Sequence, residues 1–361
     1  MKATQQLHDA GQSLWLDNIT RDLLTSGTMR RYRDEFSVTG LTSNPTIFDL
    51  AIRNGNAYDE SIRKKTVQDK SGEELFFDLA LEDLTQAADL FRPIYDSTKG
   101  IDGWVSLEVS PLLAYDTAST IKEAARLYAK ANRPNMFIKI PGTREGVPAI
   151  EESIFEGVPI NITLLFSREQ YIAAAEAYMR GIERRIAAGR DPKVHSIASV
   201  FISRWDKAVI EKVPEPLRNR LGIAIAERTY KAYRDLLKSA RSQKLAEAGA
   251  VSQRLLWAST GTKDPNAPDI MYIEALAAPD TVNTIPEKTL LAFADHGRMK
   301  GVMPADGGDT EQVLAEFARA GVDDARLAEE LQREGAEAFN KSWNDLMDCL
   351  RSKSDQLKKA S

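Results

Sequence analysis

A lysine interrupts a short apolar segment in the middle of the chain. The segment reads Asn135-Met-Phe-Ile-Lys-Ile-Pro-Gly142, and its charged residue is Lys139. Successive side chains of a β-strand point to opposite faces, so Phe137 and Lys139 would share one face and the neighbouring aliphatic residues the other. Burial disfavours the ammonium form, and a neutral lysine amine can attack a carbonyl carbon to form a Schiff base. The competing interpretation is a charge that protects an exposed edge strand from pairing with another chain.

Further polar residues interrupt the apolar pattern near the ends of other short β-type segments. Carboxylates occur in Leu14-Trp-Leu-Asp17 and, as Glu108, in Val105-Ser-Leu-Glu-Val109. Amide, hydroxyl and guanidinium groups occur at Thr42, Asn44, Asn161, Thr163, Ser199 and Arg204. Burying so many polar groups is costly unless they bond to each other or to a ligand. Together they therefore indicate a binding site.

Each of these residues also has a local structural interpretation. Asp17 could cap a helix that begins near Thr20, and Asn44, followed by a proline, could cap another helix. Asn161 and Thr163 could be hydrogen-bonded polar groups of the core, and Arg204 could pair with a carboxylate. For Asn44, the capping role and a role in a site are compatible.

The elements that must position these residues alternate regularly along the chain. Amphipathic segments typical of helices include 72–92, 118–131, 168–188 and 217–246. Between such segments lie β-type runs at 13–17, 37–42, 104–109, 135–141, 159–166, 196–203, 254–260 and 281–285. Strand and helix repeated in this way predict a closed (β/α)₈ TIM barrel, in which chemistry gathers at the carboxyl ends of the strands. A doubly wound open sheet is the alternative, but Asp17-Asn-Ile-Thr20 lacks the glycine-rich phosphate loop expected after its first strand.

The connections 45–103 and 205–253 are longer than a minimal barrel needs. They predict extra helices and not separate domains. Residues 309–361 are rich in Glu, Ala, Arg, Leu and Lys, which predicts a helical C-terminal extension packed on the barrel. We therefore expect a single domain spanning residues 1–361.

The composition of the 361-residue chain is that of a globular protein, with 43% hydrophobic and 28% charged residues. A net charge of −5 and dispersed basic residues argue against a nucleic-acid surface. No membrane span or signal peptide is evident, so the expected location is the cytoplasm. Cys349 is the only cysteine, and His8, His195 and His296 lack the spacing of a metal motif, so neither a metal nor another cofactor is expected.

Five motifs in this order resemble the transaldolases of the pentose phosphate pathway, most closely the longer bacterial subfamily. The resemblance covers nearly the whole chain. The motifs are Leu14-Trp-Leu-Asp17, Val38-Thr-Gly-Leu-Thr-Ser-Asn-Pro-Thr46, Phe137-Ile-Lys-Ile-Pro141, Ile160-Asn-Ile-Thr-Leu-Leu-Phe-Ser167 and Trp257-Ala-Ser-Thr-Gly-Thr-Lys263.

The resemblance implies a class I aldol mechanism in which Lys139 forms a Schiff base with a ketose phosphate. It makes Asp17 the acid/base at the bond that breaks. Glu108 would move protons with a water held by Asn44 and Thr163. The implied reaction transfers dihydroxyacetone from sedoheptulose 7-phosphate to glyceraldehyde 3-phosphate.

The resemblance further implies substrate contacts, and the phosphate site departs from part of the family. Shorter transaldolases use an arginine in the loop where this chain has Lys263, which could instead be a solvated loop lysine. The implied substrate-binding residues are Thr42, Asn161, Ser199, Arg204, Ser259 and Lys263. Two other functions remain open, a Schiff-base aldolase that releases free product and a non-catalytic barrel that binds sugar phosphates. The chain could be a monomer or a homodimer.

Overall fold

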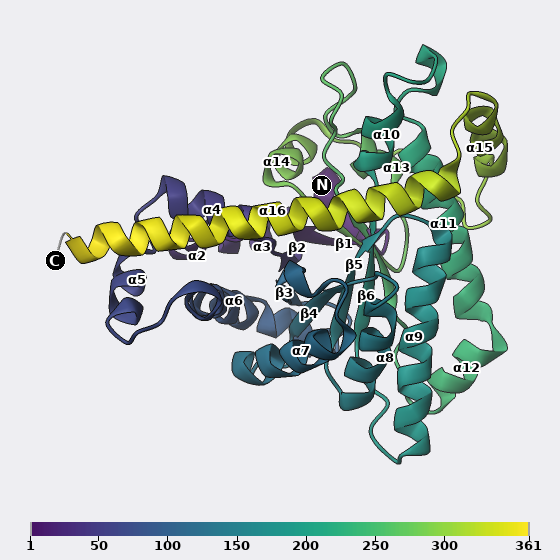
Figure 1. Cartoon of the computed structure of the whole chain (residues 1–361). Helices are drawn as coiled ribbons and strands as arrows, with labels where there is room; N and C mark the ends of the chain where they lie inside the picture. The colour runs from purple at the N-terminus through teal and green to yellow at the C-terminus, as the bar shows by residue number, and fades with distance from the viewer. Residues whose placement is uncertain (1, 360–361) are drawn as a thin grey trace.

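Parallel strands form a closed barrel surrounded by helices in the computed structural model, which describes residues 2–359 (Figure 1). Each strand pairs with the next one along the chain, and β8 pairs with β1 to close the sheet. This order confirms the (β/α)₈ prediction and rules out the doubly wound sheet. The strands are β1 (Ser13–Leu16), β2 (Val38–Thr42), β3 (Val105–Glu108), β4 (Met136–Pro141), β5 (Ile160–Leu165), β6 (Ser196–Phe201), β7 (Arg254–Ala258) and β8 (Thr281–Ile285).

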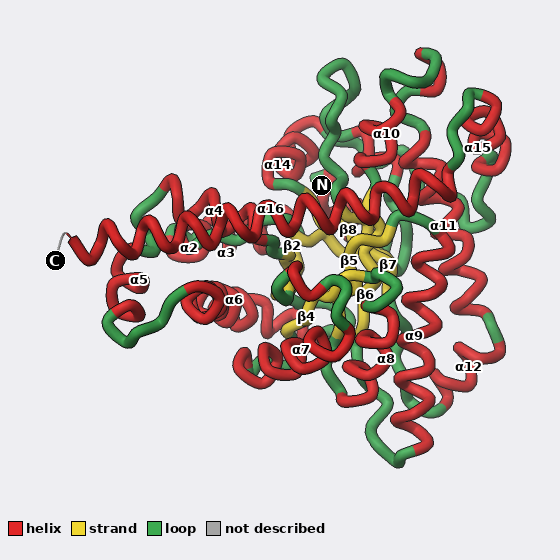
Figure 2. The backbone as a smooth tube through the Cα atoms, in the orientation of Figure 1, coloured by secondary structure: helices red, strands yellow, loops and turns green. Residues whose placement is uncertain are grey.

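The helices enclose the strands, as the tube view shows (Figure 2). The segment expected to be helical at 217–246 divides into a short 3₁₀ turn and two helices. The α-helices are α1 (Ala3–Asp9), α2 (Arg21–Thr25), α3 (Thr28–Phe36), α4 (Pro45–Asn54), α5 (Asp59–Thr66), α6 (Gly72–Ser97), α7 (Thr117–Ala131), α8 (Gly146–Glu156), α9 (Arg168–Ala187), α10 (Ser203–Val209), α11 (Leu221–Lys238), α12 (Ala240–Glu247), α13 (Met271–Ala275), α14 (Glu287–His296), α15 (Thr310–Arg319) and α16 (Asp324–Lys359). The 3₁₀ turns are η1 (Pro111–Leu113) and η2 (Glu215–Leu217).

Strand β4, which carries Lys139, lies inside the sheet between β3 and β5. The edge-strand interpretation of Lys139 is therefore wrong, since a closed barrel leaves no free edge. Phe137 packs in the barrel interior, where its ring centroid lies 4.0 Å from that of Trp104 and 6.2 Å from that of Trp15. Ile138 and Ile140 belong to the apolar layer between strands and helices. The alternation along this strand is thus confirmed, and Lys139 points inward.

The connection from β2 to β3 contains helices α4, α5 and α6, and it meets the C-terminal helix. Helix α16 is 36 residues long and crosses in front of the strands in Figure 1. It packs against α4, α5 and α6 and reaches β5. Trp343 anchors this contact, because its ring lies 5.1 Å from that of Phe76 and 5.7 Å from that of Phe77. The C-terminal helix therefore joins the inserted helices to the mouth of the barrel.

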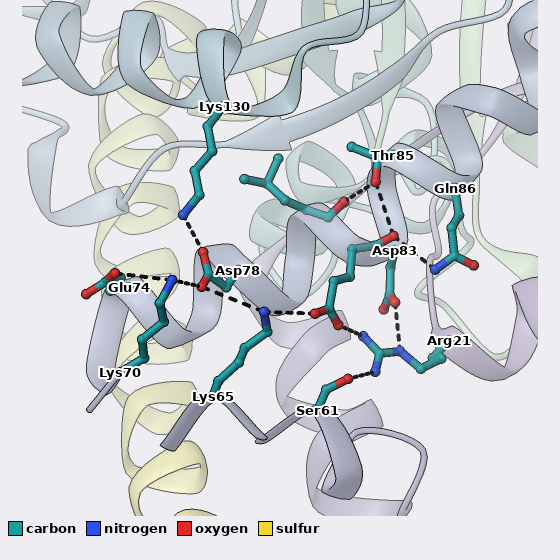
Figure 3. A network of polar contacts seen from close by, with 12 residues as sticks. Arg21, Ser61, Lys65, Lys70, Glu74, Asp78, Asp83, Thr85, Gln86 and Lys130 are labelled. Carbon is teal, nitrogen blue, oxygen red and sulfur yellow. Dashed lines mark hydrogen bonds and ion pairs between the residues drawn. The ribbon is translucent and has the colours of Figure 1, made fainter. Parts of the chain in front are cut away.

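A polar network fastens the inserted helices to α2 (Figure 3). Asp83 of α6 is fully buried and accepts hydrogen bonds from Arg21 Nε at 2.8 Å and from Tyr58 Oη at 2.7 Å. Arg21 also donates to Glu82 at 2.8 Å and to Ser61 at 2.7 Å. A buried charge needs such partners, so Asp83 is expected to contribute strongly to the stability of this contact.

Replacing Asp83 with alanine is expected to lower the free energy of unfolding by about 3 kcal/mol, because it removes the buried partner of Arg21 and Tyr58. Urea denaturation measures this loss. Asp96→Ala is the matched control on the same helix, since Asp96 pairs with Arg92 at the surface. An exposed pair contributes less than about 1 kcal/mol. Equal losses in the two variants would contradict the expected role of Asp83.

Candidate active site

A cavity of about 300 Å³ opens where the carboxyl ends of the strands meet. Most of the residues selected from the sequence line it, although they come from distant parts of the chain. Those in its wall are Asp17, Thr42, Asn44, Lys139, Thr163, Ser199, Arg204, Ser259 and Lys263. Glu108 and Asn161 are buried and do not line the cavity. This arrangement follows from the parallel barrel, which brings all strand ends of one kind to one face.

Lys139 is buried and reaches the cavity with its amino group. Its Nζ donates to Glu108 Oε2 at 3.0 Å and to the carbonyl oxygen of Ser43 at 3.4 Å. Glu108 is its register partner on the adjacent strand β3. Burial raises the pKa of Glu108, and the nearby charge of Lys139 opposes only part of that rise. The carboxyl group is therefore a better proton acceptor than an exposed glutamate.

Asp17 follows β1 and supplies a second carboxylate to the cavity. Thr42 Oγ1 donates to Asp17 Oδ1 at 3.0 Å, and the hydroxyl oxygens of Thr42 and Thr284 lie 2.6 Å apart. Burial raises the pKa of Asp17, while Lys139, the hydrogen bond from Thr42 and the charge of Lys263 counteract part of the rise. The hypothesis that Asp17 caps a helix is wrong, because Thr20 caps α2.

Asn44 caps α4, as the sequence indicated, and still faces the cavity. Its Oδ1 accepts a hydrogen bond from the backbone N–H of Ile47 at 3.1 Å. The carbonyl side of the amide is therefore occupied by the helix, and the nitrogen side remains available for a ligand oxygen.

Thr163 presents a buried hydroxyl that has no hydrogen-bond partner within residues 2–359. The next residue, Leu164, has a φ of 59°, and the register of β5 against β6 shifts at this point. A left-handed conformation is unfavourable for leucine, so the surrounding structure must hold it. An unpartnered hydroxyl facing a cavity is suited to bind water or a substrate oxygen.

Asn161 lies beneath the cavity and not in its wall. Its Nδ2 donates to Ser106 Oγ at 3.0 Å, and Ser199 Oγ donates to Asn161 Oδ1 at 2.7 Å. The amide therefore fixes the hydroxyl of Ser199, which does line the cavity. These contacts agree with the local interpretation, in which Asn161 is a hydrogen-bonded polar residue of the core.

Arg204 and Lys263 place two cations at the cavity, where the charge of Glu334 acts on Arg204 and that of Asp17 acts on Lys263. Within residues 2–359, neither forms an ion pair with a carboxylate, contrary to the hypothesis that Arg204 does. Burial lowers the pKa of Arg204, and burial together with Arg204 lowers the pKa of Lys263. Ser259 is nearby in the loop after β7. Unpaired, partly desolvated cations of this kind are suited to bind an anion such as phosphate.

The sequence did not single out several residues that line the cavity. Thr284 could have been found, because alternation along β8 puts Val282 and Thr284 on the same inner face. Phe201 follows Ser199 by the same spacing on β6. Phe339 of α16 carries no local signal, since its position depends on how a distant helix packs.

Two kinds of feature are missing from residues 2–359. No group of three or more His, Cys, Asp or Glu residues is placed there to hold a metal ion. None of the helices in this range has the length and apolar character needed to cross a membrane.

The fold and the cavity define a (β/α)₈ barrel enzyme whose site is built around a buried lysine and two carboxylates. The family model described as transaldolase/fructose-6-phosphate aldolase matches residues 14–350. The chain belongs to this family.

Curated relatives match along almost their entire length. A transaldolase of Parafrankia sp. (strain EAN1pec) is 44% identical over 359 residues, which cover 97% of both chains. A transaldolase of Arthrobacter sp. (strain FB24) is 42% identical over 99% of both chains. A transaldolase of Thermobifida fusca (strain YX) is 44% identical over 95% of this chain and 96% of its own length. The resemblance noted in the sequence is confirmed.

Proposed function

We propose that the chain acts as a transaldolase that transfers a dihydroxyacetone unit from sedoheptulose 7-phosphate to glyceraldehyde 3-phosphate. The products are erythrose 4-phosphate and fructose 6-phosphate. The observation that carries this proposal is the buried amine of Lys139, which reaches the cavity and lies 3.0 Å from Glu108. Family membership supports the reaction class.

In the proposed mechanism, Lys139 attacks the ketone carbon of the donor after Glu108 takes its proton. The raised pKa of Glu108, caused by burial, favours this transfer. The same carboxyl group then returns a proton to the departing hydroxyl, so that the carbinolamine loses water and becomes an iminium ion. Asn44 and Thr163 are proposed to hold the water that carries these protons, since both face the cavity.

Asp17 is proposed to act at the bond that breaks. It takes the proton of the hydroxyl on the leaving carbon, the carbon–carbon bond cleaves, and the aldose phosphate departs. The dihydroxyacetone unit stays on Lys139 as an enamine until an acceptor aldehyde arrives, which makes the enzyme a transferase. Asp17 is held in place by the hydroxyl group of Thr42, which is in turn hydrogen-bonded to that of Thr284.

The substrate phosphate is proposed to bind Arg204 and Lys263, with hydroxyl contacts from Ser199 and Ser259. The lack of a carboxylate partner for either cation supports this assignment. Asn161 is proposed to support Ser199 from below, because its amide already bonds to Ser106 and Ser199.

Trapping the covalent intermediate tests the function. Borohydride reduction in the presence of fructose 6-phosphate should add the mass of the bound fragment to the peptide containing Lys139, measured by mass spectrometry. An active protein with an unmodified Lys139 would refute the mechanism. Appreciable turnover without an acceptor aldehyde would instead indicate a free aldolase.

Replacing Thr42 with valine is expected to move the acidic limb of the pH profile of kcat to higher pH. The hydrogen bond from Thr42 lowers the pKa of Asp17, so its loss raises that pKa and Asp17 is protonated at higher pH. Steady-state kinetics across pH measure the shift, and Thr39→Val on the same strand is the control, because Thr39 bonds to the carbonyl of Leu14. A shift to lower pH, or an equal shift in the control, would contradict the role of this hydrogen bond.

We further propose that residues 1–361 form a single domain, with 309–361 as its helical extension; residues 1, 360 and 361 lie outside the described residues. We propose a cytoplasmic location for the protein. We also propose that it is a monomer or a homodimer, and light scattering of the purified protein distinguishes these two states.

A further inference from the structure

Helix α16 contributes an aromatic ring to the cavity, close to the amine of Lys139 and the guanidinium group of Arg204. The ring centroid of Phe339 lies 5.5 Å from Lys139 Nζ and 6.0 Å from Arg204 Cζ. Phe339 also lines the cavity wall. One side chain thus borders both the group proposed to bind the carbonyl carbon and a group proposed to bind the phosphate.

Hydrogen bonds hold the helix in this place. Gln332 Nε2 donates to the carbonyl oxygen of Gly142 at 3.0 Å and to that of Leu164 at 2.9 Å. Gly142 directly follows β4, which carries Lys139, and Leu164 follows Thr163 on β5. The helix is therefore bonded to the strand ends that carry the site. On the other side of the ring, Thr46 Oγ1 donates to Ser342 Oγ at 2.9 Å. Phe339 lies between these two attachments along α16.

A glycine allows the close approach. A Cβ at Gly335 would lie 2.9 Å from Leu164 Cδ2 and 3.1 Å from Arg204 Nη1. Glycine is unfavourable inside a helix by about 1 kcal/mol relative to alanine, so packing must offset this loss. The contact brings the following turn of the helix, with Phe339, over the cavity.

We propose that Phe339 is a specificity-determining residue whose ring contacts the sugar chain between the carbonyl carbon and the phosphate. This inference rests on the proposed function, since Lys139 then fixes the carbonyl carbon, and Arg204 with Lys263 fixes the phosphate. The chain that joins these two points must pass the ring that borders both of them. The ring offers no hydrogen bond to the hydroxyl groups and limits the space that the chain can occupy.

Selection between donors of different length follows from this geometry. With the carbonyl carbon and the phosphate both held, the ring of Phe339 favours the donor whose carbon chain spans the distance between them without folding against the ring. One methylene more or less in a hydrophobic pocket changes kcat/KM by about 10- to 200-fold, and the two donors differ by one carbon. Truncation of Phe339 enlarges the pocket, so it should favour the longer donor.

The test compares fructose 6-phosphate and sedoheptulose 7-phosphate as donors for the wild-type protein, Phe339→Ala and Phe339→Leu. The ratio of kcat/KM for the seven-carbon donor to that for the six-carbon donor is expected to rise about tenfold in Phe339→Ala and less in Phe339→Leu. A ratio that stays within about twofold of wild type in both variants overturns the proposal. Should Phe339→Ala fail to fold, Phe339→Leu decides by the same ratio.

Inorganic phosphate separates direct contact from an effect through Arg204. As a competitive inhibitor it reports on the cations, and its inhibition constant is expected to remain unchanged in Phe339→Ala. If phosphate inhibits Phe339→Ala more weakly, by a factor similar to the change in donor ratio, direct contact is overturned. The ring would then act by positioning Arg204.

A control variant on the same helix is Lys341→Ala, because Lys341 is exposed and pairs only with Asp345 among the described residues. It should keep the wild-type ratio, and a shift equal to that of Phe339→Ala overturns the proposal. Failure of the proposed function would be visible separately, as a wild-type protein without a borohydride-trapped fragment on Lys139.

Discussion

Replacing Lys139 with alanine is expected to lower kcat by about 10⁴-fold or more, because the amine proposed to form the covalent intermediate is removed. Lys139 lines the cavity, and its partner Glu108 lies behind it at 3.0 Å. Turnover is measured by coupling the formation of the aldose product to an indicator enzyme. The trapped adduct should disappear together with the activity.

The control for this variant is Lys341→Ala, which removes an exposed lysine from α16 and should retain full turnover. Urea denaturation of both variants checks that the loss is not a loss of folding. Both Lys139→Ala and a second variant, Lys139→Met, leave Glu108 buried without its ion-pair partner, but Lys139→Met keeps a side chain of similar size and so leaves no cavity. Activity above about 1% of wild type in a folded Lys139→Ala or Lys139→Met protein would contradict the role of this lysine.

Replacing Arg204 with leucine is expected to lower kcat/KM for glyceraldehyde 3-phosphate by about 10²- to 10³-fold, since charge-assisted bonds to a phosphate are strong in a partly desolvated site. Unphosphorylated glyceraldehyde should lose less than about threefold, because it does not use this cation. The comparison of the two acceptors therefore isolates the phosphate contact. Arg204→Lys keeps the charge without the planar fork and should fall between the wild type and Arg204→Leu.

Stability provides an independent check on the same residue. Arg204 has no carboxylate partner within residues 2–359, and burial lowers its pKa, with Glu334 opposing part of that effect. Its removal should therefore leave the free energy of unfolding unchanged or slightly raised. Equal losses with both acceptors, or a large loss of stability, would show that Arg204 is structural and does not bind phosphate.

Local sequence patterns were sufficient to predict the strands and the inward direction of Lys139. A strand has a side-chain period of two, so the inward direction of Phe137 and Lys139 followed from the order of residues alone. The gathering of Asp17, Thr42 and Thr163 at one mouth followed from the parallel barrel, which places all carboxyl ends on one face. The predicted strand ends extend at most a few residues beyond those observed.

Packing between distant segments could not be predicted in the same way. Asn161 shares an inner face with Thr163, yet it lies deeper and bonds to Ser106 and Ser199, because position along the barrel axis is not contained in alternation. The place of Phe339 depends on how α16 crosses the barrel mouth. The fully buried Asp83 likewise depends on α2 meeting α6. Such contacts join residues far apart in sequence and leave no periodic signal.

The glycine at position 335 has a consequence for engineering. Replacement of helical glycines by alanine is a standard route to greater thermal tolerance, because alanine favours the helix and restricts the unfolded chain. At Gly335 the added methyl group would meet the side-chain ends of Leu164 and Arg204, so these side chains or α16 would have to shift. A screen that selects only for heat resistance does not detect such a change at the cavity, so selection at this position should include turnover.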